Sequence, residues 1–152
     1  MIWYHLPMHT PVKAFQWRIN SSFGFRYHPV TKQWKLHKGL DFAVPCDSMV
    51  LAAGAGIVMN TGYDQNLGNF IKLNHGLNWI SVYAHLSKIL VSASDFIFSS
   101  TLIALSGTTG HSTGCHLHYG IYFKNMEIDP LGYFAILKKK NLSVTPLHAL
   151  KY

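Results

Sequence analysis

Short runs in which apolar and polar residues alternate cover much of the chain, and glycines separate many of them. Alternation with a period of two residues is typical of β-strands that bury one face. No long segment has the period of about 3.6 residues that marks an amphipathic helix. The sequence therefore predicts a mainly β protein.

These runs are predicted to form one domain with two flanking segments. Residues 1–20 are expected to be an N-terminal lead-in segment, residues 21–137 the compact body, and residues 138–152 a basic C-terminal tail. The length of 152 residues fits a single domain, and 49% hydrophobic with 14% aromatic residues can supply a sizeable core. This composition excludes a disordered chain and a small scaffold held by disulfides.

Two of the predicted strands carry histidines on their open face. Within residues 79–86 the even positions are apolar, so a buried face is expected from Ile80, Val82, Ala84 and Leu86. The opposite face of the same strand would then hold Ser81, Tyr83 and His85. Within residues 116–123 the same parity buries Leu117, Tyr119, Ile121 and Phe123, and leaves open His116, His118 and Tyr122.

A third run places a histidine and a carboxylate on one face. In an extended chain His37, Gly39 and Asp41 point the same way, and the glycine between the two polar residues leaves room for an ion or a substrate. Histidines and one carboxylate from three strands are therefore predicted to converge on one face of a sheet.

Acidic residues are scarce, which restricts the chemistry. The chain has 6 Asp and Glu against 10 His, and Glu127 is its one glutamate. A glycosidase requires two carboxyl groups across the scissile bond, and the H-E-x-x-H pattern of many metalloproteases is absent. Histidine is thus the expected acid or base of an enzyme with this composition.

Two neutral imidazoles and one carboxylate, with a fourth position open for water, form the ligand set of a catalytic zinc site. His37, Asp41 and one histidine of the His116/His118 pair supply that set, and strand parity does not decide which of the two it is. His85 and the remaining histidine could then orient the water and transfer its proton. The competing interpretation is that ten histidines form suggestive pairs by chance, and no role is assigned to His5, His9, His28, His75, His111 and His148.

The motifs resemble those of the LytM and lysostaphin-type zinc endopeptidases, which cut peptide cross-links of bacterial peptidoglycan. The resemblance spans about residues 21–131 and rests on Ser22-Phe23-Gly24-Phe25-Arg26-Tyr27-His28-Pro29, His37-x-Gly39-x-Asp41, Gly68-Asn69, Tyr83-Ala84-His85-Leu86, Ser106-Gly107-Thr108-Thr109-Gly110, Ser112-Thr113-Gly114-Cys115-His116-Leu117-His118 and Asp129-Pro130. It implies a fold of the LytM/lysostaphin type, which is a duplicated hybrid motif and resembles a barrel-sandwich. In this fold an antiparallel β-sheet forms a narrow groove.

The resemblance also assigns roles to the residues. His37, Asp41 and His118 would bind one Zn²⁺ per chain, and His85 and His116 would be the catalytic pair. Arg26, Asn69 and Tyr83 are candidate groove residues. The sequence departs from the family at positions that often hold glycine, where it has Asp47, Ser94, Ser100 and Ala104, and it has Leu67 where a tyrosine is frequent.

The function that the resemblance implies is a zinc-dependent metalloendopeptidase that hydrolyses peptide cross-links of bacterial peptidoglycan. The alternative is a noncatalytic LytM-like module that binds the wall or activates an amidase, although noncatalytic members usually lack one or more of the five site residues kept here. A third hypothesis is a latent enzyme with residues 1–20 lying in the groove.

The two cysteines, Cys46 and Cys115, each lie beside a motif. If the motifs converge on one metal ion, the thiols become neighbours, and a disulfide between them fits an oxidising compartment. Two free thiols in a reducing compartment are the alternative.

The net charge of +7 indicates an anionic partner, for which the cell-wall polymer is the preferred candidate. Basic residues are scattered and no zinc-finger spacing occurs, so nucleic acid is not expected as a partner. No transmembrane segment and no signal peptide is visible in the sequence. A monomer that acts in the periplasm, outside the cell or as a phage-delivered hydrolase is expected.

Overall fold

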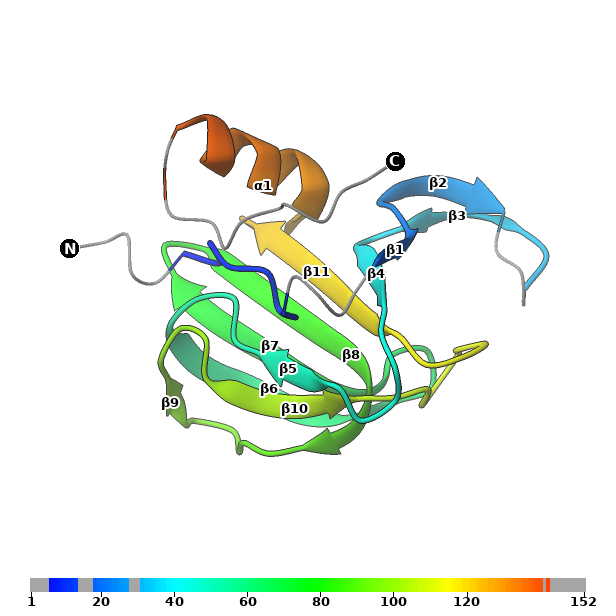
Figure 1. Ribbon diagram of the computed structural model, residues 1–152, viewed down its shortest axis with the longest axis horizontal. Coiled ribbons are helices and arrows are strands. Elements are labelled where there is room, and N and C mark those ends of the chain that lie inside the picture. The colour runs from blue at the N-terminus through cyan, green and yellow to red at the C-terminus, as the bar shows by residue number, and fades with distance from the viewer. Residues whose placement is uncertain (1–5, 14–17, 28–30, 141, 143–152) are drawn as a thin grey trace.

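The computed structural model describes residues 6–13, 18–27, 31–140 and 142 (Figure 1). The strands, in chain order, are β1 (Arg18–Ser21), β2 (Gly24–Tyr27), β3 (Trp34–His37), β4 (Leu40–Ala43), β5 (Met49–Leu51), β6 (Gly56–Asp64), β7 (Gly68–Gly76), β8 (Trp79–Ile89), β9 (Phe96–Ile97), β10 (Leu102–Ser106), β11 (Leu117–Phe123) and β12 (Met126–Ile128). One helix, α1 (Pro130–Lys139), follows the strands. The prediction of a mainly β protein is confirmed.

Ten of the strands form one antiparallel sheet, in which the main path runs β1-β4-β11-β8-β7-β6-β9. The long strand β8 also pairs with β10, which in turn pairs with β5, and β12 extends the sheet beside β11. The hairpin of β2 and β3 is a separate two-stranded sheet that projects from one side of the molecule (Figure 1). The sheet is thus a central scaffold with the hairpin as a neighbouring wall.

Strand β8 is buried on both faces, which corrects the face predicted for two of its residues. Ser81 and Tyr83 were expected on an open face, but both have no exposed surface. Tyr83 lies directly opposite Tyr119 of β11, and both tyrosines belong to the hydrophobic core. An alternating pattern cannot identify the solvent face of a strand that has none, because the neighbouring strands and loops cover both sides.

The helix α1 was not predicted, although its local signals are present. Asp129 is the N-cap and accepts a hydrogen bond from the Leu131 amide, and Pro130 follows at the first helical position, where its missing N–H costs nothing. The helix contacts β11, and the Phe134 ring stacks on Tyr119. It ends at Lys139, beyond the predicted domain boundary at residue 137. In the described part of the chain, no helix is long and apolar enough to span a bilayer.

The described part of the N-terminal segment belongs to the body. Met8 and Val12 are buried in the core cluster, and the backbone of His9 and Pro11 hydrogen-bonds to residues around β5. Residues 6–13 are therefore packed on the sheet and not laid along a groove. Lys140 and Leu142 are the described residues that follow α1, so most of the predicted basic tail lies outside the described residues.

Several turns have the positive φ angle that is typical of glycine, although the residue at that position is not glycine. Asp47, Ser94 and Ser100 have φ angles of 61°, 74° and 62°, in the left-handed region that glycine enters most easily. The resemblance to the LytM and lysostaphin-type family implies a frequent glycine at these positions. The turn geometry is thus retained, and each serine bears the steric cost of a Cβ, about 1–2 kcal/mol.

Replacing Ser94 or Ser100 by glycine is expected to stabilise the protein. Relief of the left-handed strain is worth about 1–2 kcal/mol, and the extra freedom of glycine in the unfolded chain costs about 0.5–1 kcal/mol. The free energy of unfolding should therefore rise by about 0.5–1 kcal/mol per substitution, measured by urea denaturation. Ser92→Gly, at a position without positive φ, is the control and should lower it. Destabilisation by both test substitutions would contradict this account.

Candidate metal centre and active site

The pairing of β4 with β11 sets Asp41 directly opposite His118. Side chains of directly opposite residues project to the same side of a sheet. The Oδ1 atom of Asp41 and the Nδ1 atom of His118 are consequently 2.8 Å apart. Strand register alone therefore brings together two groups that are 77 residues apart in the sequence.

His37, at the end of β3, supplies a third atom to the same point. Its Nε2 is 3.1 Å from Asp41 Oδ1 and 3.1 Å from His118 Nδ1. Its Nδ1 is 2.8 Å from the Ser22 carbonyl oxygen and can donate its hydrogen there. That bond leaves the Nε2 lone pair directed at the cluster, which is the arrangement typical of metal-binding histidines.

The three side chains fit a metal ion. One atom from each of His37, Asp41 and His118 lies within 4.8 Å of the other two, which makes them a candidate metal-binding group. Ligands about 2.0–2.1 Å from a tetrahedral zinc ion are about 3.3 Å apart, close to the separations found here. Two nitrogens and one oxygen from nearly buried side chains are also a chemically suitable zinc set.

Gly39 makes room for the His118 ring. A Cβ at position 39 would lie 2.5 Å from the Tyr119 carbonyl oxygen and 2.7 Å from His118 Cε1. The sequence predicted that this glycine leaves space for an ion or a substrate. In the structure this space is occupied by the His118 ring and the Tyr119 backbone of β11. Gly39 therefore affects the cluster by leaving room for His118.

Electrostatics favour a charged Asp41 carboxylate and a neutral His118 imidazole in the cluster. Burial alone would raise the pKa of Asp41, but hydrogen bonds with His118 and His37 outweigh it and hold the pKa well below its usual range. Burial lowers the pKa of His118, and its contact with Asp41 only partly opposes this. Asp41 therefore stays ionised at neutral pH, and His118 favours its neutral, metal-binding form.

His85 reaches the cluster because its backbone departs from regular strand geometry. Its φ angle is 60°, so the strand alternation that would turn it toward the core with Tyr83 is broken at this residue. Its Nδ1 is 2.8 Å from the Thr109 carbonyl oxygen, and its ring centroid is 5.9 Å from that of His118. Burial lowers the pKa of His85 to about 4, which keeps the ring neutral near pH 7.

His116 lies beside His85 with the same orientation of its ring nitrogens. Its Nδ1 is 2.8 Å from the Gly114 carbonyl oxygen, and its Nε2 is 3.9 Å from Asp41 Oδ1. The ring centroids of His85 and His116 are 4.6 Å apart. Each ring can donate Nδ1–H to the backbone, which leaves its Nε2 as a proton acceptor. The structure therefore gathers all five residues singled out in the sequence.

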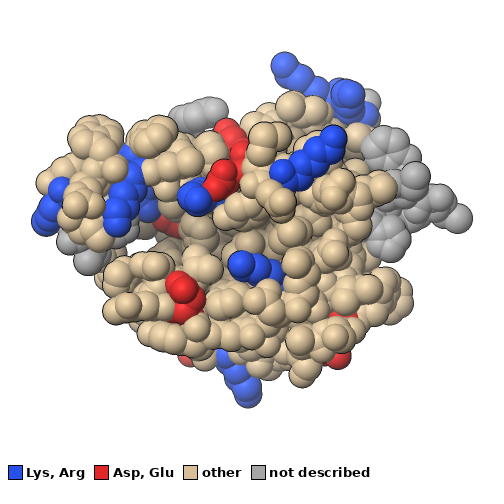
Figure 2. Space-filling model, turned by 180° about the vertical axis from the view of Figure 1, so that it is seen from behind, with Lys and Arg blue, Asp and Glu red and all other residues tan. Residues whose placement is uncertain are grey.

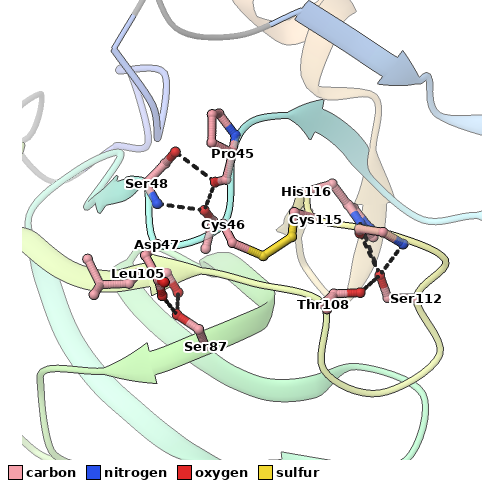
Figure 3. Close-up of a disulfide and its surroundings, with 12 residues drawn as sticks. Pro45, Cys46, Asp47, Ser48, Ser87, Leu105, Thr108, Ser112, Cys115 and His116 are labelled. Carbon is pink, nitrogen blue, oxygen red and sulfur yellow. Dashed lines mark hydrogen bonds between the residues drawn. A yellow bond between two sulfur atoms is a disulfide. The ribbon is translucent and has the colours of Figure 1, made fainter.

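A disulfide joins the loop after β4 to the loop before β11 (Figure 3). Cys46 and Cys115 are 69 residues apart in sequence, and their Cα atoms are 5.2 Å apart. Cys115 directly precedes His116, and Ser112 contacts the His116 ring from the same loop, with Oγ 3.3 Å from Nδ1. The covalent link therefore ties the His116 loop to the end of the strand that carries Asp41.

A groove of about 720 Å³ contains the cluster. Its lining includes one carboxylate, Asp41, and four cationic side chains, Arg18, Arg26, Lys35 and Lys38. Lys38 is paired with Glu127 at 2.7 Å, whereas Arg18 and Lys35 have no ion pair within the described part of the chain. Lys and Arg side chains also occur on several parts of the face in Figure 2, with fewer Asp and Glu among them. The groove is accordingly positive outside its metal-binding group.

Two of the three predicted groove residues lie elsewhere. Tyr83 is fully buried, and its hydroxyl accepts a hydrogen bond from the Ala53 amide. Asn69 is not among the residues that line the groove, and its side chain donates to the Leu86 carbonyl oxygen at 3.0 Å. Arg26 does line the groove. Tyr83 and Asn69 therefore support β8, which carries His85, and do not face the groove.

The residues that hold His85 were not predicted from the sequence. Thr109 presents its carbonyl oxygen to the ring, and its own hydroxyl donates to the Leu86 carbonyl oxygen. Gly68 has a φ of 63° and packs against Thr109 so closely that a Cβ would lie 2.4 Å from its backbone. The Gly68-Asn69 and Thr108-Thr109-Gly110 motifs were visible in the sequence, but backbone carbonyls that orient a ring have no side-chain signature.

Comparison with known proteins identifies the family. The sequence model described as Peptidase family M23 matches residues 35–130. The chain therefore belongs to this family of metallopeptidases, which confirms the resemblance found in the sequence.

Individual relatives agree with this membership. The chain is 39% identical over 117 residues to "Peptidoglycan DD-endopeptidase ShyA" of Vibrio cholerae, covering 76% of this chain and 27% of that protein. It is 40% identical over 130 residues to an "Uncharacterized metalloprotease" of Buchnera aphidicola, covering 84% and 35%. The chain thus spans about a third or less of the length of these relatives.

Solved structures confirm the predicted fold class. A zinc-containing peptidase from Vibrio cholerae superposes with a TM-score of 0.74 at 36% identity, covering 78% of this chain and 37% of that one. The catalytic domain of lysostaphin from Staphylococcus simulans superposes with a TM-score of 0.70 at 27% identity, covering 78% and 92%. The described domain therefore has the fold of the lysostaphin catalytic domain.

Gly39→Ala is expected to damage the metal centre. Its Cβ would overlap the Tyr119 backbone and the His118 ring, so His118 must move out of its place beside Asp41. Overpacking of this kind costs about 1–3 kcal/mol, and displacement of this candidate ligand should lower the content of bound metal after dialysis by at least about tenfold. Metal analysis and thermal unfolding measure the two effects.

Gly114→Ala is the matched control, because a Cβ at that position meets no atom within 4 Å. It should keep the metal content and stability of the original protein. A Gly39→Ala protein with unchanged metal content would show that the cluster does not hold the metal.

Proposed function

We propose that this chain is a zinc-dependent endopeptidase that hydrolyses peptide cross-links of bacterial peptidoglycan, and that it cuts the D,D type of cross-link. The observation that supports this most strongly is the constellation of five residues in one groove. His37, Asp41 and His118 form the candidate metal-binding group, and two further histidines lie beside it. A module that only binds the wall has no need for that second pair.

The metal-binding group and the histidine pair divide the chemistry between them. A zinc ion held by the three residues supplies a Lewis acid that polarises the substrate carbonyl and makes water more acidic. His85 and His116 act as the acid and base. Both have Nδ1 beside a backbone carbonyl oxygen, which holds the tautomer with a free Nε2.

Proton transfer by this pair follows from its environment. A ring with free Nε2 accepts a proton from the attacking water, and the resulting imidazolium can donate one to the departing amine. The low pKa of His85, about 4, means that this ring is neutral before the reaction at pH 7. Charged side chains near the oxygen of the tetrahedral intermediate also stabilise it, which is a second role for a protonated histidine.

The substrate class follows from the relatives and from the charge of the groove. ShyA carries the name of a DD-endopeptidase and is 39% identical to the matched residues, whereas lysostaphin is 27% identical. Stem peptides with free carboxylates are anionic, and the groove is lined by four Lys and Arg side chains against one Asp. We place this activity at the cell envelope, where the substrate occurs.

Digestion of purified muropeptides tests the substrate. D,D-cross-linked dimers of the meso-diaminopimelate type should be converted to monomers, and glycine-bridged muropeptides should remain intact, as followed by liquid chromatography and mass spectrometry. Incubation with a chelator should abolish cleavage, and added zinc should restore it. Cleavage of the glycine bridge alone would disprove the D,D assignment, and activity that resists chelation would disprove metal dependence.

Substitutions of the histidine pair test the mechanism. His85→Ala and His116→Ala should each lower kcat by about 10²–10⁴-fold, the usual contribution of a general acid or base, while the protein still binds zinc. His9→Ala, outside the groove, controls for the loss of a histidine and should retain kcat. Near-normal turnover in the His116→Ala protein would defeat the proposed mechanism.

A further inference from the structure

Arg26 is placed beside the candidate metal centre by the register of the β2–β3 hairpin. In this hairpin Arg26 lies opposite Lys35, and Gly24 lies opposite His37. Opposite residues and alternate residues of an antiparallel pair share one face, so Arg26 and His37 project from the same side. The other side of the hairpin carries aromatic residues that are exposed, such as Phe25 and Trp34.

The guanidinium of Arg26 contacts the carboxylate oxygen that the histidines leave free. Nη2 of Arg26 is 3.4 Å from Oδ2 of Asp41. Oδ1 of the same carboxylate lies 2.8 Å from His118 Nδ1 and 3.1 Å from His37 Nε2. The two oxygens of Asp41 therefore face different partners, one the candidate metal-binding group and the other a fixed positive charge.

We propose that Arg26 is a positioning residue that holds Asp41 as a one-oxygen ligand of the metal ion. With Oδ2 occupied by the guanidinium, the carboxylate cannot rotate to offer both oxygens, and the remaining coordination positions stay available for water and substrate. This inference rests on the proposed metal site but not on the identity of the bond that is cut.

The environment of the pair makes the contact effective. The Asp41 side chain is 8% exposed and that of Arg26 is 33% exposed, so solvent screens the contact from one side only. At 3.4 Å the contact is longer than a tight charge-assisted hydrogen bond of about 2.7–2.9 Å, and it acts mainly through charge. Among the described residues of the separate hairpin, Arg26 and His37 are the two that form an ion pair with Asp41.

The direction of the effect on metal binding results from two opposing contributions. Removing a positive charge near the metal ion favours metal binding, and releasing the carboxylate from its fixed orientation disfavours it. Loss of a partner that orients a metal ligand typically weakens metal affinity by about 10–100-fold, and charge repulsion screened by the open groove is smaller. The net expectation for an arginine removal is weaker metal binding.

Zinc affinity measured by competition with a chromophoric chelator, without any substrate, tests the proposal. Arg26→Met should bind zinc about 10–100-fold more weakly than the original protein. Arg26→Lys keeps the charge and should recover part of that loss. Arg18→Met is the matched control, since Arg18 lines the same groove and forms no ion pair with Asp41 in the described part of the chain. It should leave the zinc affinity unchanged within about twofold.

A second readout reports the coordination itself. In the cobalt-substituted protein the visible absorption of Arg26→Met should weaken relative to the original protein, because a two-oxygen carboxylate raises the coordination number. Unchanged zinc affinity and an unchanged cobalt spectrum in folded Arg26→Met, with an effect confined to KM, would overturn the proposal and make Arg26 a substrate-binding residue. If Arg26→Met does not fold, Arg26→Gln, which also removes the charge, takes its place, and unchanged zinc affinity in folded Arg26→Gln would overturn the proposal. Lack of peptidase activity in every variant would count against the proposed function and leave this test intact.

Discussion

The register between β4 and β11 is the constraint on which the site depends. It sets Asp41 directly opposite His118, and both residues must point to the groove side for the cluster to exist. A shift of one residue would turn every side chain of the strand to the other face of the sheet. Burial fixes this register, because Leu40 and Phe42 of β4 and Leu117 and Tyr119 of β11 have no exposed surface.

The other parts of the site are attached to this pair by loops with restricted geometry. The turn through Gly39 connects β3 to β4 and admits the His118 ring. The disulfide ties the His116 loop to the segment that follows β4. His85 has a positive φ angle, and so does Gly68, which packs against Thr109, the residue whose carbonyl oxygen contacts the His85 ring. The site is thus a set of loop positions fixed by a rigid sheet.

Much of the site was predictable because it depends on residue type and on strand alternation. Alternation correctly placed His118 with the open side of β11, and it placed His37 with Asp41. It failed for β8, where Tyr83 is in the core and His85 reaches the site through a φ of 60° that no residue pattern announces. The roles of Ser22, Thr109 and Gly114 depend on backbone carbonyls, so only three-dimensional structure could reveal them.

Long-range geometry and local signals contributed differently to the prediction of the fold. The β class followed from the alternation, and family motifs indicated the groove. The helix α1 was missed although Asp129 and Pro130 mark its start, because a ten-residue helix produces only a short periodic signal. Glycine-type turns at Ser94 and Ser100 could not be read from the residues present, since serine rarely adopts that conformation.

The central claim is that His37, Asp41 and His118 form one zinc centre, with His85 and His116 outside its ligand set. Anomalous diffraction at the zinc absorption edge, from crystals of the zinc-loaded protein, locates the ion directly. The account predicts one peak at about 2.0–2.1 Å from His37 Nε2, Asp41 Oδ1 and His118 Nδ1. A zinc ion bound by His85 or His116, or no zinc at this cluster, would contradict it.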